Sequence, residues 1–336
     1  MWGPLAGPPA FLIVVTIMGK LTYQIIENYR SDAKNYPGIG RAMRISNGKY
    51  EVIVTLDVGI RIMHFSLVGR PNNFDDDCAL IENMPDGRTW YSYGGQRLWH
   101  APEAFPRSYA IDDIPLEKYE ITDKGIRMYR EIEAESNIQK IVEIEFCEDK
   151  LIVYNRLVNR NPWPVELAAW TQTAIADGLM VYPVTQRNSG LLPNTHYVVW
   201  PYAKMTDSRA YFGEQFITIV TDSQNTDPFK FGYPDEYGWA ALFTNGMCFV
   251  KKFGFCEKAV YPDRGCNLEC YVQDWGAEME DLSPLQTLQP GQMCEHKNEW
   301  YLFDNVSCPK PKDEAEIFRV LCPMIESVGL EMPERK

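Results

Sequence analysis

The sequence predicts an all-β protein, built as a large sandwich or barrel. Segments of strand-like composition follow one another at short intervals and are separated by turn residues. Residues 128–133 alternate with a period of two, as a strand with two different faces requires. Helical periodicity is clear in a single segment near the C-terminus. Because no repeat or linker divides the 336 residues, we expect one large domain.

The clearest element is an early hairpin. Arg41–Ile45 and Tyr50–Thr55 flank Asn47-Gly48, a dipeptide that accepts the positive φ of a tight turn. Further strands are expected in the segments that read IRIMHFSLVG, LEKYEIT, GIRMYREIEAE, IQKIVEIEFCE, KLIVYNRLVN, VELAAWTQTAI, FITIVTD, GWAALFTNGMCFVKKFGF, NLECYVQDW and HKNEWYLFD. Their number and spacing favour a sandwich or barrel over a parallel sheet with crossover helices.

One helix is predicted near residues 313–328. Ile317, Leu321 and Ile325 recur there at helical spacing. A second, short helix is expected at Leu21–Asn28. The expected organisation is an N-terminal extension and lead-in at 1–39, the β-domain at 40–305, and a helical tail packed on the same domain at 306–336.

The composition limits the partners of this chain. The formal net charge is −13, and no basic stripe is present that would neutralise phosphates, so a nucleic-acid partner is not expected. The nine cysteines form no CxxC pair, and Cys266 and Cys270 lack the second pair that a zinc site needs. No GxGxxG before a helix, P-loop or HExxH occurs. We therefore expect free thiols, no metal and no cofactor.

The N-terminal segment is apolar but lacks the basic start of a signal peptide. No charged residue precedes Lys20, and the apolar run Ala10–Met18 is too short to span a bilayer. We interpret the residues before Met18 as an upstream extension, with a weak signal or anchor as the alternative. No later segment has the length of a transmembrane helix. With the cysteine pattern, this predicts a cytoplasmic protein without a membrane partner.

The stretch GGQRLWHAPE, residues 94–103, gathers several groups that bind polar ligands. Arg97 supplies a planar fork of donors, and Trp99 offers a flat face for a sugar ring. His100 suits proton transfer, and Glu103 is expected to orient it or to bind ligand. The alternative is an aromatic-rich loop that closes one end of the sandwich.

A second polar cluster lies in residues 261–275, which read YPDRGCNLECYVQDW. Asn267, Glu269 and Tyr271 alternate and are therefore expected on one face of a strand, with apolar side chains on the other. A carboxylate on this face is suited to act as a general base. The alternative is an edge strand with a solvated polar face. For His196, in a loop before a strand, a site role and a structural role are both open.

The order of several motifs gives the chain a family resemblance. These motifs read ISNGKYEVIVTLDVGIRIMHFSLVG, GGQRLWHAPE, VELAAWTQTAIADGLMVYP, LLPNTHYVVWPYAKMTD, GWAALFTNGMCFVKKF, YPDRGCNLECYVQD and LSPLQTLQPGQMCEHKNEWYLF. Across about residues 40–305 they resemble the galactose-mutarotase-like (aldose 1-epimerase-like) superfamily. More closely, they resemble an uncharacterised bacterial family within it, known as a domain of unknown function. The resemblance implies a large antiparallel β-supersandwich with a sugar-binding concave face.

The resemblance also implies roles for individual residues. In the mutarotases a carboxylate on a late strand takes the proton from the anomeric hydroxyl, and a histidine protonates the ring oxygen. Glu269 matches the late base, and Arg97 and His100 match an early ligand-binding segment. The segment of the acid histidine offers Trp170 and Gln172 instead. The expected catalytic residues are Glu269 and His100, and the expected ligand-binding residues are Gln96, Arg97, Trp99, Glu103, Trp170, His196 and Asn267.

Three functions follow from this pattern. The first is a carbohydrate-active protein with a mutarotase-like site, in the sharpest form an aldose 1-epimerase acting on a free sugar. The second is a carbohydrate-binding protein without catalysis, because the acid is missing from its usual segment. The third is a domain associated with polysaccharide lyases or hydrolases. In each case the partner is a mono- or oligosaccharide, and the sequence does not determine the oligomeric state.

Overall fold

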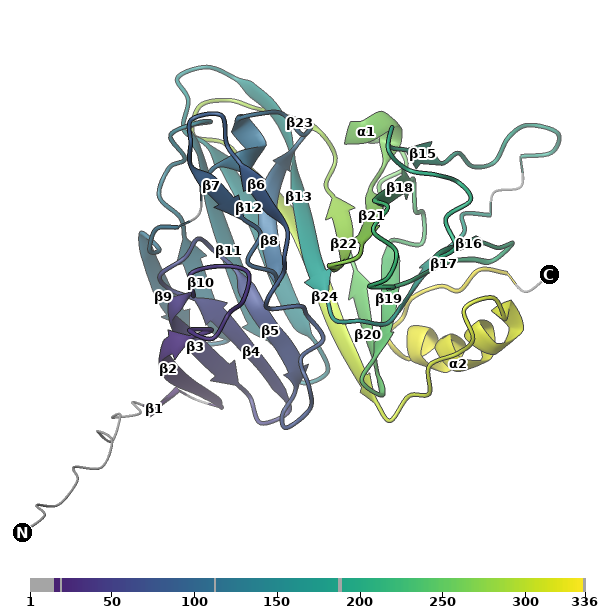
Figure 1. Cartoon of the computed structure of the whole chain (residues 1–336), viewed down its shortest axis with the longest axis horizontal. Coiled ribbons are helices and arrows are strands. Elements are labelled where there is room, and N and C mark those ends of the chain that lie inside the picture. The colour runs from purple at the N-terminus through teal and green to yellow at the C-terminus, as the bar shows by residue number, and fades with distance from the viewer. Residues whose placement is uncertain (1–14, 19, 112, 187–188, 335–336) are drawn as a thin grey trace, which may run out of the picture.

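The computed structural model describes residues 15–18, 20–111, 113–186 and 189–334 (Figure 1). Almost all of its regular structure is β-strand, and the pairings within both large sheets are antiparallel. The two sheets pack over a shared core. For example, Phe65 of the larger sheet meets Trp300 of the smaller one, with 5.2 Å between ring centroids. This is the all-β sandwich that the sequence predicts.

The larger sheet has twelve strands in the order β1-β2-β3-β4-β5-β8-β13-β22-β21-β18-β15, with β23 paired to β13. Their bounds are β1 Val15–Met18, β2 Leu21–Tyr29, β3 Gly40–Ser46, β4 Tyr50–Thr55, β5 Ile62–Leu67, β8 Gln96–Ala101, β13 Val165–Ile175, β15 Val198–Val199, β18 Phe229–Tyr233, β21 Leu268–Gln273, β22 Gly276–Leu282 and β23 Gln286–Leu288. The middle of this sheet, from β8 to β18, is where the candidate site is built.

The smaller sheet has ten strands in the order β16-β17-β14-β19-β20-β24-β12-β11-β10-β9. Their bounds are β9 Lys118–Thr122, β10 Gly125–Tyr129, β11 Ile138–Phe146, β12 Leu151–Asn159, β14 Leu179–Pro183, β16 Ala210–Phe212, β17 Phe216–Val220, β19 Trp239–Thr244, β20 Met247–Lys252 and β24 Met293–Asp304. The remaining elements are the hairpin of β6 Ile81–Asn83 and β7 Thr89–Tyr91, the 3₁₀ turn η1 Arg107–Tyr109, and the helices α1 Pro262–Gly265 and α2 Glu314–Ser327.

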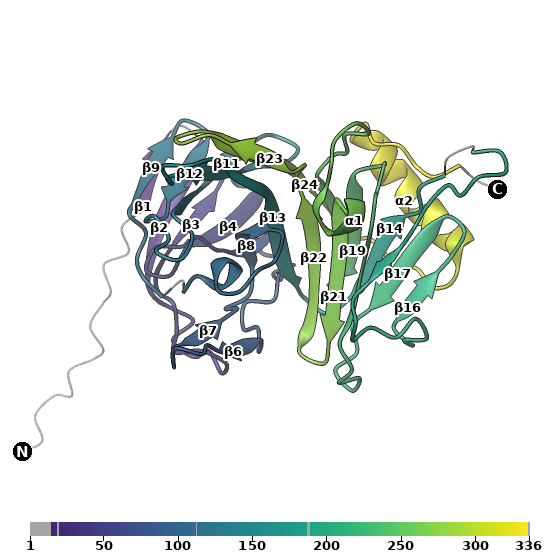
Figure 2. The ribbon, with the colours of Figure 1, turned by 90° about the horizontal axis from the view of Figure 1, so that it is seen from above.

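The C-terminal helix covers the outer face of the smaller sheet (Figures 1 and 2). Asp313 caps it by accepting a hydrogen bond from the Glu316 amide at 2.9 Å. Its buried apolar stripe, including Ile317 and Leu321, packs against a cluster that contains Trp239. The helix predicted near 313–328 is confirmed.

Two early elements test the local sequence patterns. The hairpin at Asn47-Gly48 is confirmed, because β3 and β4 pair across it and Gly48 has a φ of 86°. The short helix expected at Leu21–Asn28 is wrong. That segment is strand β2, which pairs with β3, because an edge of the large sheet offers it a full hydrogen-bonding partner. Most of the predicted upstream extension, residues 1–14, lies outside the described residues.

Two further expectations concern cysteines and membranes. All nine cysteines are free thiols, as the odd count and the spacing predict. Within the described part of the chain, neither helix is both long and apolar enough to cross a bilayer. The cytoplasmic location stays a prediction.

Candidate functional site

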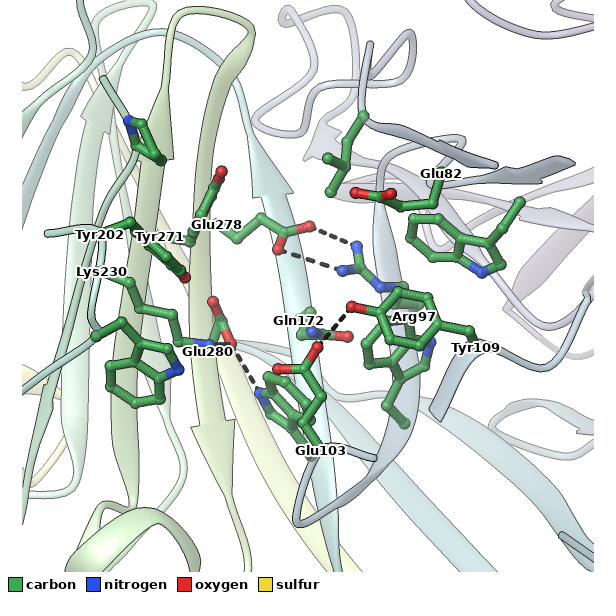
Figure 3. A pocket seen from close by; sticks show the side chains of 16 residues that line it. Glu82, Arg97, Glu103, Tyr109, Gln172, Tyr202, Lys230, Tyr271, Glu278 and Glu280 are labelled. Atoms are coloured by element: carbon green, nitrogen blue, oxygen red, sulfur yellow. Dashed lines mark hydrogen bonds and ion pairs between the residues drawn. The ribbon is translucent and has the colours of Figure 1, made fainter. Parts of the chain in front are cut away.

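The candidate site is a cleft on the face of the larger sheet that points away from the shared core (Figure 3). Its volume is about 320 Å³, within the range of small-molecule sites. Its lining residues are Leu80, Glu82, Trp90, Arg97, Trp99, Glu103, Tyr109, Trp170, Gln172, Trp200, Tyr202, Pro228, Lys230, Tyr271, Glu278 and Glu280. Aromatic and charged side chains therefore dominate its walls.

The two-residue period of the strands selects which side chains reach the cleft. On β22, Glu278 and Glu280 line the cleft, whereas Met279 packs into the shared core. On β18, Lys230 lines the cleft between two core phenylalanines, Phe229 and Phe231. Because neighbouring strands are paired in register, the polar residues of one strand lie beside those of the next.

The first wall comes from the segment that begins with Gly94-Gly95. Gly95 has a φ of 63°, and a Cβ there would lie 2.3 Å from the carbonyl oxygen of Ile62, so only glycine fits this close strand contact. Arg97 and Trp99 follow on β8 and line the cleft. The Arg97 guanidinium lies 4.8 Å from the Trp99 ring centroid, a cation–π contact.

Arg97, on β8, is held by the carboxylate of Glu278, on β22, across the intervening strand β13. Its two terminal nitrogens donate to the two oxygens of Glu278, and Nη1 also donates to Ser92 Oγ at 3.2 Å. Both Arg97 and Glu278 are 3% exposed. A bidentate pair of this kind fixes the geometry of both groups.

A second ionic cluster forms the centre of the other wall. Lys230 Nζ lies 2.8 Å from Glu269 Oε2 and 2.9 Å from Glu280 Oε2. The Nε1–H of Trp170 also donates to Glu280 Oε2, at 2.8 Å. The ammonium group sits 4.7 Å from the ring centroid of Trp170 and 4.6 Å from that of Trp200. Two buried carboxyl groups thus share one lysine.

This sharing changes the acidity of both carboxyl groups. Burial raises the pKa of Glu269 to about 8, with Lys230 opposing the rise and the charge of Glu280 adding to it. Burial likewise raises the pKa of Glu280 to about 7, again against the attraction of Lys230 and with repulsion from Glu278. One lysine cannot neutralise two buried carboxylates, so near neutral pH the cluster retains a proton. Of the two groups, Glu280 is the one that lines the cleft.

Several sequence-predicted residues meet in this cleft. Arg97, Trp99, Glu103 and Trp170 all line it. Glu103, at the rim, accepts a hydrogen bond of 2.5 Å from the hydroxyl of Tyr109. The orientation of His100 by Glu103, expected from the sequence, is not what the structure shows.

His100 and Gln96 lie on the other face of β8. The strand period turns them away from Arg97 and Trp99, and neither lines the cleft. His100 Nε2 lies 3.2 Å from Glu133 Oε2, and burial lowers the pKa of His100 despite that carboxylate. Gln96 donates to Asn155 at 3.3 Å. These side chains stabilise the interior, and an acid role for His100 does not fit this position.

The three other predicted residues do not line the cleft. Glu269 is fully buried behind Lys230. Asn267 accepts from the Asp235 amide at 2.7 Å and donates to two carbonyl oxygens, which ties neighbouring loops together. His196 is exposed, with Nε2 at 3.2 Å from the carbonyl oxygen of Arg264.

The sequence reasoning missed the central charged residues of the cleft. Glu278 and Lys230 each stand between apolar neighbours in the segments GAEMEDL and FKFGY, and Glu280 follows the core residue Met279. A charged residue flanked by core residues in a strand is a signal for a polar face, and it was available in both segments. What the segments do not show is that their strands lie near β8, because that depends on the order of strands in the sheet.

Comparison with known proteins identifies the fold. No protein-family model matches the sequence, and no curated protein matches it. Among solved structures, a candidate aldose 1-epimerase from Klebsiella pneumoniae is similar over 91% of this chain and 87% of its own, at 11% identity and a TM-score of 0.55. The fold is galactose-mutarotase-like. Membership of the narrower bacterial family stays a prediction.

Two further structures share this fold. A candidate mutarotase from Salmonella typhimurium matches over 87% of this chain and 96% of its own, at 9% identity and a TM-score of 0.52. A TPR-domain containing protein from Parabacteroides distasonis matches at 12% identity and a TM-score of 0.52. The match covers 89% of this chain but only 55% of that protein, so this chain spans about half of its length. At these identities the likeness concerns the fold alone.

Proposed function

We propose that this protein is carbohydrate-active and binds a sugar in the cleft. The observation that carries the proposal is the pairing of aromatic faces with buried carboxyl groups on one concave surface. Trp200, Tyr202 and Tyr271 are partly exposed there, so their rings are available for stacking. Glu278 and Glu280 lie beside them as hydrogen-bond acceptors for hydroxyl groups.

The chemistry that this arrangement favours is the interconversion of anomers, as in an aldose 1-epimerase. A base takes the proton from the anomeric hydroxyl, an acid gives a proton to the ring oxygen, the C1–O5 bond breaks, and closure on the other face yields the second anomer. Glu278, held in a bidentate ion pair by Arg97, is suited by its position to act as the base. Glu280, with a pKa near 7, is suited to act as the acid. Two acids with different environments are a recurrent acid–base arrangement.

A sugar-binding protein without catalysis is the second candidate. It is favoured by the strong engagement of the charged groups, since Arg97 is bound to Glu278 and Lys230 is bound to both Glu269 and Glu280. The hydrolase alternative requires two acids that flank a glycosidic bond. Glu278 and Glu280 instead project from the same strand.

The test combines binding with anomer exchange. Titration of monosaccharides should show saturable binding, and exchange NMR should show faster interconversion of the bound sugar's anomers. Glu280→Gln should leave the affinity within about threefold and slow the exchange roughly 100-fold or more, because the amide keeps the shape but cannot donate a carboxylic proton. Glu269→Gln is the comparison variant. It leaves Lys230 to pair with Glu280 alone, so Glu280 should lose its proton near neutral pH, and exchange should slow at pH 7 but recover at lower pH.

Three outcomes would decide between the candidates. Binding with no acceleration would leave the sugar-binding protein and remove the epimerase. Loss of exchange in Glu269→Gln but not in Glu280→Gln would return the catalytic role to Glu269. Cleavage of oligosaccharides into shorter products would favour the hydrolase or lyase. Absence of binding to every sugar would overturn the proposal.

A further inference from the structure

The charges that line the cleft do not balance. Four carboxyl groups line it, those of Glu82, Glu103, Glu278 and Glu280. Even when the Glu269–Glu280 cluster retains one proton, the remaining carboxylates outnumber the two cationic groups of Arg97 and Lys230. Both cationic groups already form ion pairs with carboxylates of the protein. Arg97 binds Glu278 through both terminal nitrogens, and Lys230 lies within 2.9 Å of Glu269 and Glu280.

The rim carries the unbalanced charge. Glu82 and Glu103 are both exposed. Within the part of the chain that the structure describes, neither has a basic side chain at ion-pair distance, and the polar partner of Glu103 is the hydroxyl of Tyr109. Glu103 also acts electrostatically on Asp263, whose pKa is raised by burial and then by that charge. The entrance to the cleft is therefore electronegative.

Among the residues that the structure describes, five buried polar atoms of the cleft-lining residues lack a hydrogen-bond partner. Three are donors, Arg97 Nε, Trp90 Nε1 and Trp99 Nε1, from which sugar hydroxyl groups can accept, and two are acceptors. Gln172 is 3% exposed and Glu280 is 1% exposed, and each has one side-chain oxygen, Oε1, with no hydrogen-bond partner. The two residues are directly opposed in the register of β13 and β22. In Figure 3, Gln172 lies between Glu280 and Arg97. Buried acceptors of this kind are costly unless a donor from a ligand or water reaches them.

An ammonium group matches both features. It brings positive charge to an electronegative cleft, and it offers three donors and no acceptor. A neutral hydroxyl group supplies one donor and no charge. A phosphate or carboxylate group on the ligand would meet the carboxylates of Glu82 and Glu103, while Arg97 and Lys230 are already paired with carboxylates of the protein.

We infer that the sugar bound by this cleft carries a protonated amino group, so that the ligand class is that of amino sugars. The inference rests on the proposed function, because it assumes that the cleft binds a sugar. It adds a charge requirement that neither aromatic stacking nor the fold supplies. Anionic sugars, such as uronates and hexose phosphates, are correspondingly disfavoured.

The test compares sugars that differ in one group. Isothermal titration at pH 6 would use glucose, 2-amino-2-deoxyglucose, 6-amino-6-deoxyglucose, N-acetylglucosamine and glucuronate. At least one amino hexose should bind about tenfold more tightly than glucose, since a hydrogen bond to a charged group is worth more than one between neutral groups. N-acetylation should remove this gain at position 2, and glucuronate should bind more weakly than glucose.

Rim variants locate the effect. Glu82→Gln combined with Glu103→Gln should reduce the preference for the amino hexose over glucose to about threefold or less. Glu148→Gln, in the exposed turn after β11, removes the same charge elsewhere and should leave this preference unchanged. These side chains are exposed, so the variants should fold.

The failure of this inference differs from the failure of the proposed function. If neutral hexoses bind and no amino hexose binds more tightly, the amino-sugar inference is wrong and sugar binding stands. If glucuronate binds best, the charge argument is also wrong. If no sugar binds, the proposed function itself fails, and the inference fails with it.

Discussion

Glu280 and Asp281 are neighbours in the sequence, yet they belong to two different ionic clusters. The strand period turns Glu280 to the cleft, beside Lys230, and Asp281 to the interior, beside Lys251. Both acids are nearly fully buried. Nevertheless, their acidities shift in opposite directions.

The interior cluster surrounds one carboxylate with several donors. Asp281 is bound by Lys251, by His296 at 2.5 Å and by Asn298 at 2.7 Å. Burial opposes its ionisation, but Lys251 and His296 outweigh burial and lower the pKa of Asp281 well below its usual range. The cleft cluster gives one lysine to two carboxylates, and the pKa of Glu280 rises to about 7.

The comparison shows that burial alone does not set the behaviour of an ionisable group. The number of donors available to each buried carboxylate decides whether its pKa rises or falls. A carboxylate with several donors, such as Asp281, stays charged and stabilises the structure. Two carboxyl groups that share one lysine retain a proton near neutral pH, and a group that titrates in this range is suited to proton transfer. The raised pKa values of Glu269 and Glu280 therefore mark the cleft cluster, and not the interior one, as the functional candidate.

The largest expected effect comes from breaking the interior cluster. Asp281→Asn should lower the free energy of unfolding by about 3–5 kcal/mol, because Lys251 remains buried without its counter-charge. Urea unfolding at pH 7 measures it. Glu280→Gln, the adjacent residue on the other face, is the matched control and should cost less than about 1 kcal/mol at that pH, because Glu269 can then pair with Lys230 alone. A similar loss in both variants would contradict the contrast between the clusters.

A smaller effect should appear in the pH dependence of stability. The folded-state pKa of Glu280 is raised from 4.5 to about 7, so its contribution is fully present below about pH 4.5 and is lost as pH rises through 7. The protein should thus lose up to about 3 kcal/mol between pH 5 and pH 8 through this cluster. Asp281 acts in the opposite sense, since its contribution is present above its ordinary pKa and is lost only in strong acid.

Glu280→Gln should flatten this loss between pH 5 and pH 8. The measurement is the free energy of unfolding at several pH values in urea. The control Glu148→Gln, in an exposed turn, should retain the dependence of the natural chain. An unchanged pH profile in Glu280→Gln would mean that the cluster does not hold a proton in this range.

The smallest effect concerns one hydrogen bond in the cleft. Trp170→Phe keeps an aromatic ring beneath Lys230 but removes the Nε1–H that donates to Glu280. The pKa of Glu280 should rise further, because the charged form loses a donor, and stability at pH 8 should fall by about 1 kcal/mol. Trp200→Phe is the control, since that ring also faces Lys230. Equal effects of the two changes would assign the loss to ring packing.

The class of the fold and several local elements could be predicted from the sequence alone. Turn residues and the two-residue period predict the β3–β4 hairpin, and helical spacing predicts α2, because these signals depend on neighbours in the chain. The same period also implies that Arg97 and His100, three residues apart on a strand, point to opposite faces. The expectation that both contact one ligand overlooked this constraint, and the structure shows them on opposite faces.

Only the tertiary structure decided which charged groups share the cleft. Arg97 on β8 and Glu278 on β22 are far apart in the sequence, and β13 lies between their strands in the sheet. Lys230 reaches Glu269 and Glu280 because β18, β21 and β22 are consecutive in that order. The segment Leu21–Asn28 likewise became a strand because the sheet edge offered it hydrogen bonds. Local patterns specify faces and turns, whereas strand order, which arises from long-range packing, determines which faces meet.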